Sequence, residues 1–441
     1  MRKIDTLLYP RWIVPIEPDN AVWQNQALAI DQGRIVDILP APEAKTAYLA
    51  NESFDLPDHV VMPGLINGHT HSAMSLLRGL ADDLPLMTWL NDYIWPAEKT
   101  WLSAEFVKDG SELAIAEMLL GGTTCFNDHY YFQNKTIEVA LKAGIRACIG
   151  LITLQFSNAW AQTETEFLDK ATQVYQEYSD HDLIHFALAP HSPYANSDET
   201  LKRVITLAET FDLSIHMHIH ETQDEVDQHI AKYHKRPLAH LHDLGLLSPR
   251  LIAVHMTQLT KDEIELVKTT HTNVVHCPEA NMKLASGICP VQALLDAGIN
   301  VGIGTDGAVS NNDLDMLGEM RSAALLAKVY TKNPKALDAT TVLRMATLNN
   351  AKALGLDKEI GSIKIGKSAD IIAVNIANLS TVPIYHPISQ LVYAVNRQQI
   401  TDVWVAGKQL VQNRKLMTLD QNNIIKNSKM WGEKIANATT Y

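Results

Sequence analysis

The sequence has little of what marks several classes of protein. Its 441 residues include only four cysteines, carry a formal net charge of −13 and contain no run approaching roughly 20 apolar residues. So few cysteines exclude a disulfide-stapled fold, and the lack of a long apolar run excludes a membrane-spanning helix. A net negative chain also lacks the clustered Lys and Arg on which affinity for a phosphate backbone rests. We expect no nucleic-acid and no membrane partner, but a small neutral or cationic substrate.

The cysteines and the first residues of the chain both bear on the cellular compartment that we expect. Cys125, Cys148, Cys277 and Cys289 form no close-spaced pair, so we expect buried thiols and neither a disulfide nor a cysteine zinc site. The chain meets an acid at Asp5, and then prolines, before any apolar stretch long enough for a signal peptide. We therefore expect a cytoplasmic protein. Its 46% hydrophobic and 20% charged composition is typical of a well-formed core.

Both ends of the chain are rich in short strands. Residues 27–30 and 34–38 are apolar runs around the turn Asp31-Gln32-Gly33, which predicts a β-hairpin. Residues 369–374 and 402–408 also predict strands, the second with a glycine turn. We expect one β module assembled from both termini. The polar last twenty residues are expected to fray or to pack on it.

The middle of the chain follows a different rhythm, in which short unbroken apolar runs alternate with longer helical segments. This pattern is typical of βα units on a parallel sheet buried on both faces. Eight such units close naturally into a barrel. The eight expected strands are residues 60–62, 123–127, 146–150, 184–188, 213–217, 251–254, 273–275 and 300–304.

The predicted fold class is therefore α/β, a (β/α)8 TIM-like barrel with a small discontinuous β-sandwich domain. We place the barrel at residues 63–365 and the two parts of the sandwich at residues 1–62 and 366–441, the second with the C-terminal tail. Ordinary signals punctuate the helices between the strands. Thr260-Lys261-Asp262-Glu263, for example, predicts a capping box.

Polar side chains follow the ends of the expected strands. In a parallel barrel the carboxyl ends of the strands share one rim, so residues far apart in the chain should meet at one mouth. The residues in question are His69 and His71 after the first strand, His191 after the fourth, His218 after the fifth, His255 after the sixth and Asp306 after the eighth.

His69-Thr70-His71 is the first candidate for metal binding. In extended backbone the side chains of residues two apart point the same way, so both imidazoles can face one ion. Among 18 histidines such a pair also arises by chance. Its place after the turn-rich run of residues 63–68 makes a site more credible.

Three alternating histidines, His216, His218 and His220, lie on the fifth expected strand, where imidazole is an unusual core filler. One can be a metal ligand and a deeper one a structural hydrogen-bonding residue, and the spacing does not rank His216 against His218. Glu221, just past the strand, is placed to act as a general acid or base beside a metal-activated water.

Asp306 ends the strand Gly302-Ile303-Gly304-Thr305. Alone it is as readily a turn or helix-capping aspartate. Together with the histidines it becomes a fourth ligand that can also accept a proton from the attacking water. Three imidazoles and a carboxylate suit zinc or ferrous iron.

These motifs resemble those of the amidohydrolase superfamily, in particular its branch of 5-methylthioadenosine/S-adenosylhomocysteine deaminases and chlorotriazine-hydrolase-like enzymes. The resemblance spans nearly the whole chain. The matching segments are residues 63–71, 218–221, 254–255, 276–284 and 304–307.

The resemblance implies roles for these residues. His69, His71, His218 and Asp306 would bind one divalent metal ion, zinc with iron as the alternative. His191 lies where two-metal relatives have a carboxylated lysine, which favours a single ion. Among the catalytic residues, Asp306 would accept the water proton, Glu221 would protonate a ring nitrogen, and His255 would polarise the water and steady the oxyanion.

The substrate side of the resemblance rests on Trp95-Pro96-Ala97-Glu98. Glu98 would hold the ribose hydroxyls, although a solvated glutamate at a helix start is the alternative. His191 would contact the purine or ribose, Ser310 would approach the ring, and Trp95 would lie beside the substrate. Some relatives have arginines after the third strand, but residues 150–156 of this chain have none, which puts contact with a homocysteine carboxylate in doubt.

The expected reaction is hydrolytic deamination of an adenosine-type nucleoside, namely 5-methylthioadenosine, S-adenosylhomocysteine or adenosine, to the inosine analogue and ammonia. One alternative is deamination of a free base such as guanine, or triazine hydrolysis, in the same site. The other is a non-catalytic scaffold with this fold. The resemblance also implies a homo-oligomer, a dimer or tetramer.

Overall fold

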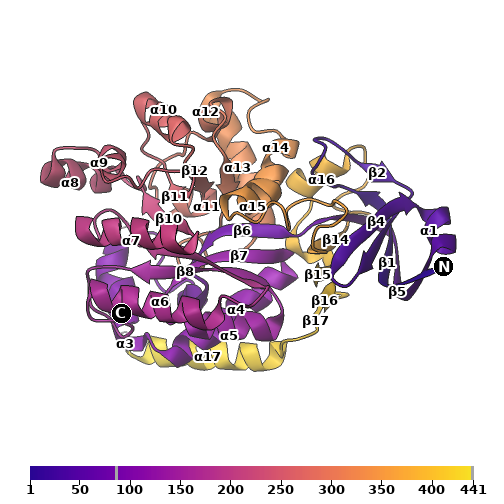
Figure 1. Cartoon of the computed structure of the whole chain (residues 1–441), viewed down its shortest axis with the longest axis horizontal. Helices are drawn as coiled ribbons and strands as arrows, with labels where there is room; N and C mark the ends of the chain where they lie inside the picture. The colour runs from indigo at the N-terminus through magenta and orange to yellow at the C-terminus, as the bar shows by residue number, and fades with distance from the viewer. Residues whose placement is uncertain (85–87, 439–441) are drawn as a thin grey trace.

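The computed structural model describes residues 1–84 and 88–438 and contains two sheets (Figure 1). The larger body is an eight-stranded parallel sheet curled into a nearly closed, TIM-like barrel. Each strand pairs with its neighbour in the chain, which confirms the predicted fold class. The strands are β6 (Leu65–Thr70), β7 (Thr123–Tyr130), β8 (Arg146–Thr153), β9 (Ile184–Pro190), β10 (Ser214–Ile219), β11 (Leu251–His255), β12 (Asn273–His276) and β13 (Val301–Ile303).

Side chains join the first and last strands of the barrel. The Nδ2 group of Asn350 donates to the carbonyl of Ile66 in β6 at 2.6 Å and to that of Ile303 in β13 at 2.7 Å. A Cβ at Gly302 would lie 1.8 Å from Oδ1 of Asn350, so only glycine leaves room for this bridge. The buried amide therefore satisfies carbonyls that the two edge strands leave unpaired.

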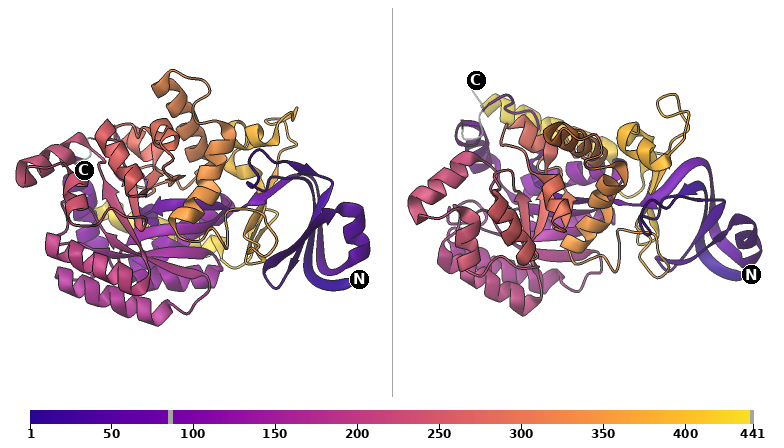
Figure 2. Two further views of the ribbon diagram at one scale, coloured as in Figure 1. Left: turned by 45° about the horizontal axis from the view of Figure 1, so that its top comes forward. Right: turned by 90° about the horizontal axis from the view of Figure 1, so that it is seen from above.

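Helices surround the barrel (Figures 1 and 2), and the capping box predicted at Thr260 and Glu263 is confirmed at the start of α10. Before β9 the helical elements are η1 (Ser72–Leu77), η2 (Trp89–Ile94), α3 (Trp95–Trp101), α4 (Ala104–Leu120), α5 (Gln133–Ala143) and α6 (Glu164–Tyr178). After β9 come α7 (Asp198–Phe211), α8 (Gln223–Tyr233), α9 (Pro237–Asp243), α10 (Lys261–Thr269), α11 (Pro278–Lys283), α12 (Val291–Asp296), α13 (Met316–Thr331), α14 (Ala339–Arg344), η3 (Met345–Asn349) and α15 (Asn350–Ala353).

The second sheet is mixed, has nine strands and draws on both ends of the chain, as predicted. Its N-terminal strands are β1 (Arg2–Ile13), β2 (Trp23–Gln24), β3 (Gln26–Asp31), β4 (Arg34–Pro40) and β5 (Tyr48–Pro63), with α1 (Ala41–Ala47) before β5. Its C-terminal strands are β14 (Ile371–Asn375), β15 (Ile400–Val405), β16 (Lys408–Gln412) and β17 (Lys415–Leu416), with α16 (Pro387–Tyr393) and η4 (Arg397–Gln399) between the first two. The predicted hairpin is the antiparallel pair β3 and β4.

The prediction that Val60, Val61 and Met62 form the first barrel strand is wrong. They belong to β5, which runs parallel to β1 and antiparallel to β14 in the other sheet. The chain then passes Gly64, where a Cβ would lie 2.0 Å from Oγ1 of Thr124, and enters the barrel as β6. The count of eight still holds because the turn-rich run after Met62 is itself a strand.

The C-terminal segment also differs from expectation. Residues 421–438 form helix α17 (Gln421–Ala438), which packs mainly on α4 of the barrel. Trp431 is 4% exposed, and its Nε1 donates to Oδ2 of Asp109 in α4 at 2.9 Å. The polar sequence hid this contact because the buried apolar side chains of the helix, Ile424, Trp431 and Ile435, are few and widely spaced.

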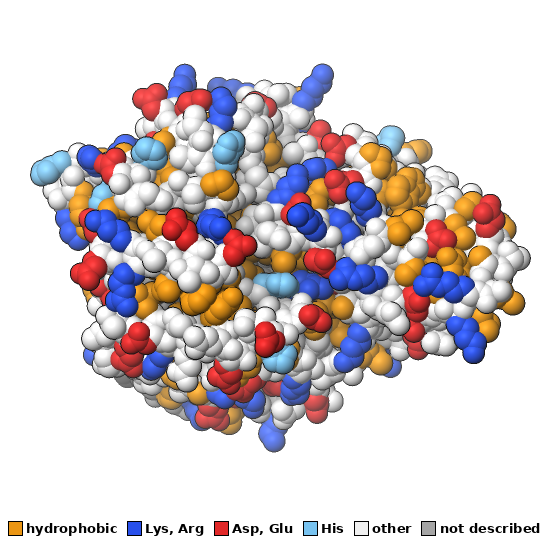
Figure 3. Space-filling model, in the orientation of Figure 1, with side chains coloured by type: hydrophobic (Ala, Val, Ile, Leu, Met, Phe, Trp, Pro, Cys, Tyr) orange, Lys and Arg blue, Asp and Glu red, His pale blue; other side chains and the backbone are white. Residues whose placement is uncertain are grey.

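A buried ion pair joins the barrel to the β module. Nε of Arg146, at the start of β8, donates to Oδ2 of Asp370 at 2.8 Å, and its Nη2 donates to Oδ1 at 3.2 Å. All four cysteines are buried and free, as expected. No helix within the described residues has the length and apolar character needed to cross a bilayer. Lys, Arg, Asp and Glu side chains are interspersed over the face in Figure 3.

Candidate metal centre and substrate pocket

Three strands bring the predicted metal ligands to the carboxyl-terminal rim of the barrel. His69 lies in β6, His71 directly follows it, His218 lies in β10, and Asp306 follows β13. The backbone N–H of Asp306 donates to the carbonyl of His69 at 3.0 Å, which fixes the two segments together. His69 is fully buried and Asp306 is 6% exposed. Residues more than 200 positions apart thus form one cluster.

The donor atoms of this cluster have the spacing of a tetrahedral ion site. Nε2 of His218 lies 3.2 Å from Nε2 of His69 and 3.3 Å from Nε2 of His71. Oδ1 of Asp306 lies 3.2 Å from Nε2 of His69 and 3.2 Å from Nε2 of His71. Donors about 2.0–2.1 Å from a tetrahedral zinc ion are about 3.3 Å from one another. The four side chains therefore fit a single divalent ion.

The outer nitrogen of each histidine explains why the inner nitrogens can bind a cation. Nδ1–H of His71 donates to the carbonyl of His129 at 2.6 Å, and Nδ1–H of His218 donates to the carbonyl of His191 at 2.7 Å. These bonds leave the Nε2 lone pairs facing one another and the carboxylate of Asp306. Such a group of acceptors is mutually repulsive without a cation among them.

The surroundings of the cluster shift the pKa values of its His and Asp side chains. Burial lowers the pKa of His69 to about 4, and burial together with the neighbouring His191 lowers that of His218 well below its ordinary range. Burial opposes ionisation of Asp306, but its contacts with His69 and His71 outweigh burial and hold the Asp306 pKa well below its usual value, while Asp306 in turn raises the pKa of His71. Neutral imidazoles and an ionised carboxylate are the forms that bind metal.

His216 and His129 lie deeper, beside His69. Nε2 of His216 is 2.9 Å from Nδ1 of His69, and these three histidines form a second cluster of nitrogen atoms. The two clusters share His69, whose Nδ1 already bonds to His216, and only the first includes a carboxylate. The geometry therefore groups His218 with the donors that could hold an ion and makes His216 an outer partner of His69.

Glu221 and His255 face each other beside this centre. Nε2 of His255 lies 3.8 Å from Oε2 of Glu221, and Ser286 donates to Oε1 of Glu221 at 3.3 Å. Asn281 donates to Nδ1 of His255 at 3.0 Å, which leaves Nε2 to carry the proton toward the pocket. Burial raises the pKa of Glu221, so this carboxyl keeps a proton to higher pH than a solvated glutamate.

Glu98 and its neighbours form the outer wall of the same pocket. Oη of Tyr130 donates to Oε1 of Glu98 at 2.7 Å, and burial raises the pKa of Glu98. Trp95 reaches the pocket but is 44% exposed, whereas Trp89 is 5% exposed. Glu98 is thus an oriented pocket carboxylate, not a solvated one.

Two other predicted contacts are partly engaged already. The hydroxyl of Ser310 donates to Oδ2 of Asp306 at 2.7 Å and contacts the carbonyl of Gly307 at 3.0 Å. The ring of His191 lines the pocket, and its Nδ1 is buried without a protein partner among the described residues. His191 can therefore accept a substrate contact, while Ser310 first orients Asp306.

The remaining wall was not identified from the sequence. It includes the aromatic residues Trp89, Tyr130, Tyr131 and Tyr194 and the apolar residue Ile152. Tyr130 ends β7 at the rim and Tyr131 directly follows it, so the rule used for the histidines could have found them. Among the described residues, no Lys or Arg lines the pocket, whereas Glu98, Glu221 and Asp306 do.

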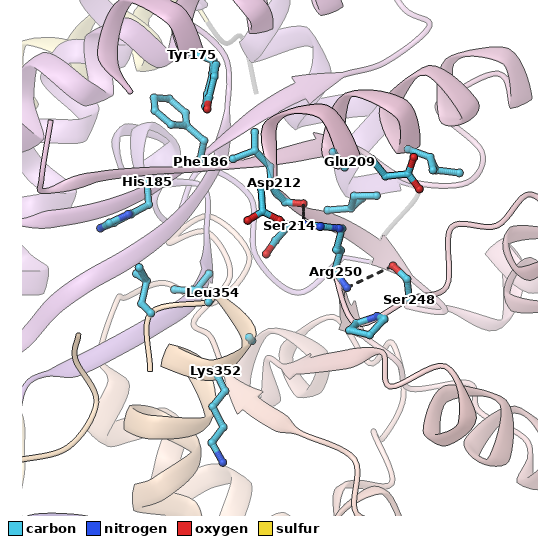
Figure 4. A pocket seen from close by; sticks show the side chains of 18 of the residues that line it. Tyr175, His185, Phe186, Glu209, Asp212, Ser214, Ser248, Arg250, Lys352 and Leu354 are labelled. Carbon is cyan, nitrogen blue, oxygen red and sulfur yellow. Dashed lines mark hydrogen bonds and ion pairs between the residues drawn. The ribbon is translucent and has the colours of Figure 1, made fainter. Parts of the chain in front are cut away.

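A larger cavity, of about 730 Å³, lies at the opposite end of the barrel (Figure 4). Its walls include the first residues of β9 and β10 and the loop before β11, together with Lys352. Arg250 there is paired with Asp212 at 2.7 Å. The cavity holds none of the predicted site residues, whereas all of them except His69 line the smaller rim pocket.

Known proteins are similar to this chain in sequence and in fold. Residues 60–410 match the sequence pattern of the Amidohydrolase family. A curated relative from Saccharophagus degradans, named 5-methylthioadenosine/S-adenosylhomocysteine deaminase, is 46% identical over 98% of this chain and 97% of its own length. A relative of the same name from Teredinibacter turnerae is 44% identical over 98% of both chains. The crystal structure of an adenosine deaminase from Xanthomonas campestris with bound zinc has a TM-score of 0.98 at 47% identity, covering 99% of this chain and 100% of that one.

Proposed function

The chain belongs to the amidohydrolase family, and on that premise we propose that it is a metal-dependent deaminase of adenosine-type nucleosides, which yields the inosine analogue and ammonia. The observation that carries the proposal is the meeting of three imidazoles and Asp306 with two further carboxyl groups, Glu221 and Glu98, in one pocket. Relatives that are 44% and 46% identical and named for this deamination support it.

One zinc ion held by His69, His71, His218 and Asp306 completes the proposed site. A bound divalent ion supplies Lewis acidity, which lowers the pKa of a water molecule toward about 7. The near-tetrahedral donor spacing supports a single ion, and the zinc in the Xanthomonas campestris structure supports its identity. Iron is the alternative that metal analysis would distinguish.

The protein's carboxyl groups would move the protons. Oδ1 of Asp306 takes a proton from the attacking water while Ser310 holds Oδ2. The water oxygen bonds to the purine carbon that bears the amino group, and Glu221 protonates the adjacent ring nitrogen. His255 steadies the negative oxygen through Nε2. The hydroxyl on that carbon then gives its proton to the ionised Glu221 and becomes the product carbonyl, while the carbon–nitrogen bond breaks and the amino group leaves as ammonia with the proton from Asp306.

The nucleoside would be oriented from the outer wall. Glu98 accepts hydrogen bonds from the two ribose hydroxyls, and the bond from Tyr130 keeps its carboxylate aimed at them. His191 contacts the base or ribose, Ser310 lies near the ring, and Trp95 covers the mouth. A free base offers no diol to Glu98, which makes guanine-type deamination and triazine hydrolysis the weaker alternatives.

The pocket walls also favour particular 5′-substituents. A homocysteine group carries a carboxylate, and no Lys or Arg of the described residues lines the pocket to bind it. Ile152 and the tyrosines offer an apolar surface instead. We expect 5-methylthioadenosine and adenosine to have a higher kcat/KM than S-adenosylhomocysteine.

The remaining proposals concern the protein as a whole. Four buried free thiols support a cytoplasmic location. We propose a division into residues 1–62, 63–365 and 366–441, with the first and last in one module. Assembly as a dimer or tetramer follows from the family resemblance, and sedimentation velocity would test it.

Ammonia release across adenosine derivatives, guanine, cytosine and triazines tests the function. The proposal expects turnover of nucleosides and little of free bases. Turnover of guanine or a triazine alone would establish the alternative chemistry. Purified protein that never retains metal and releases no ammonia would instead indicate the non-catalytic scaffold.

A further inference from the structure

The segment that carries Glu221 is a short left-handed bend between β10 and α8. His220 has a φ of 55°, a conformation that non-glycine residues adopt rarely. The bend turns the N–H groups of His220 and Glu221 toward the first turn of α8. There the carboxylate of Glu225 accepts a hydrogen bond from each of them. Oε1 accepts from His220 at 3.1 Å, and Oε2 accepts from Glu221 at 2.8 Å. Paired N–H groups of this kind form a cradle for an anion.

The same segment is held from its other side. The hydroxyl of Thr257 donates to the carbonyl of Glu221 at 2.7 Å and contacts that of His220 at 3.2 Å. The side chain of Glu221 is held less tightly, because its Oε1 accepts only the longer, 3.3 Å hydrogen bond from Ser286. The direction of the Glu221 carboxyl therefore depends mainly on its backbone, and Glu225 fixes the N–H side of that backbone.

An ordinary helix cap does not explain this contact. In α10, Glu263 at the third position accepts the N–H of the capping residue Thr260 at 2.9 Å. Glu225 has the equivalent place in α8, and Thr222 caps it in the usual way. Its carboxylate, however, reaches past the cap to the two residues before it. The hydrogen bonds of Glu225 therefore stabilise the segment that carries Glu221 and do not cap the helix.

We propose that Glu225 is a positioning residue for the deamination, whose carboxylate holds the backbone of His220 and Glu221 so that Glu221 faces the ring nitrogen. Glu225 does not line the pocket and acts through Glu221 alone. The inference rests on the proposed function. Burial raises the pKa of Glu225 to about 7.

The first experiment compares Glu225→Gln and Glu225→Asp with Asp224→Asn in the full-length, zinc-loaded protein. Asp224 is an exposed acid in the same helical turn, so its variant removes the same charge without touching the bend. Because about 1 Å of misplacement can cost about 10²-fold in rate, Glu225→Gln should lower kcat by about 10²-fold. KM and metal content should stay as in wild type. The aspartate of Glu225→Asp is too short to reach both N–H groups, so the kcat of this variant should lie between those of Glu225→Gln and wild type. The kcat of Asp224→Asn should match that of wild type.

Deuterium exchange followed by mass spectrometry gives a readout that does not need turnover. Peptides that cover residues 217–226 should exchange faster in Glu225→Gln, at the amides of His220 and Glu221, and not in Asp224→Asn. A Glu225→Gln protein with unchanged exchange or wild-type kcat would overturn the positioning role. If wild type released no ammonia from any nucleoside, the proposed function would fail, while the exchange result would still decide whether Glu225 holds the bend.

Discussion

The hydroxyl of Tyr130 donates a 2.7 Å hydrogen bond to Oε1 of Glu98. A bond to a charged group is worth about 1.5–3 kcal/mol, or about 10–100-fold. We expect Glu98→Ala to lower kcat/KM for adenosine by at least this factor, and Tyr130→Phe to raise KM with a smaller effect. Steady-state kinetics with 2′,3′-dideoxyadenosine is the control. Equal losses with and without the diol would contradict ribose recognition by Glu98.

Glu221→Gln keeps the size of the side chain and removes its proton. General acid catalysis contributes about 10²–10⁴-fold, so kcat should fall by that range. Metal content should not change, because the residue lies outside the four donors. Single-turnover ammonia release together with elemental analysis checks both points. Wild-type turnover by the variant would refute the acid role.

Metal removal should abolish activity, and added zinc should restore it. Elemental analysis is expected to give one ion per chain. Asp306→Asn should reduce both the metal retained and kcat, because an amide neither carries the charge nor accepts the water proton. His229→Asn, whose ring bonds to His240 away from the pocket, is the matched control. Two tightly held ions per chain would overturn the single-ion site.

The stability of the joint between the modules should depend on Arg146 and Asp370. Their side chains are 6% and 2% exposed, and removing one partner of a buried pair costs about 3–5 kcal/mol. Arg146→Met should therefore lower Tm clearly. Lys235 and Asp243, which are 54% and 50% exposed, form the control pair, and Lys235→Met should cost less than about 1 kcal/mol. Similar shifts for the two variants in thermal unfolding would contradict this view.

Glu225 should make stability depend on pH. Its pKa is about 7 in the folded protein against an ordinary 4.5, so between these values the folded state binds more proton than the unfolded one. The contribution of this group to the free energy of unfolding is thus full below the lower value and is lost as pH rises through the higher. Gln does not titrate, so the Tm of Glu225→Gln minus that of wild type should increase from about pH 5.5 to about pH 8.5. A constant or decreasing difference would contradict the raised pKa.

The sequence predicted the barrel well because apolar runs mark strands buried on both faces. It misassigned Val60–Met62 because a periodic pattern identifies a strand but not the sheet that the strand joins. Likewise nothing local indicates that Asn350 bridges the carbonyls of Ile66 and Ile303. Such contacts depend on how distant segments meet.

The candidate site shows the same division. The His and Asp residues could be gathered from the sequence because the carboxyl ends of parallel barrel strands share one rim. Spacing left His216 and His218 equal, and only their neighbours separate them: Nε2 of His218 lies beside the other donors, whereas that of His216 bonds to Nδ1 of His69. Trp89 escaped notice because in sequence a pocket aromatic looks like any core aromatic.

The pairing of β5 with β14 has a consequence for synthesis on the ribosome. Pro63 pairs with Ile371, so β5 lacks its partner β14 until the intervening barrel has been translated, which takes roughly 15–60 s at typical rates. A nascent chain thus carries an open strand edge throughout the making of its own catalytic domain, which is a template for intermolecular pairing. Early termination before β14 would leave that edge of β5 without its partner strand.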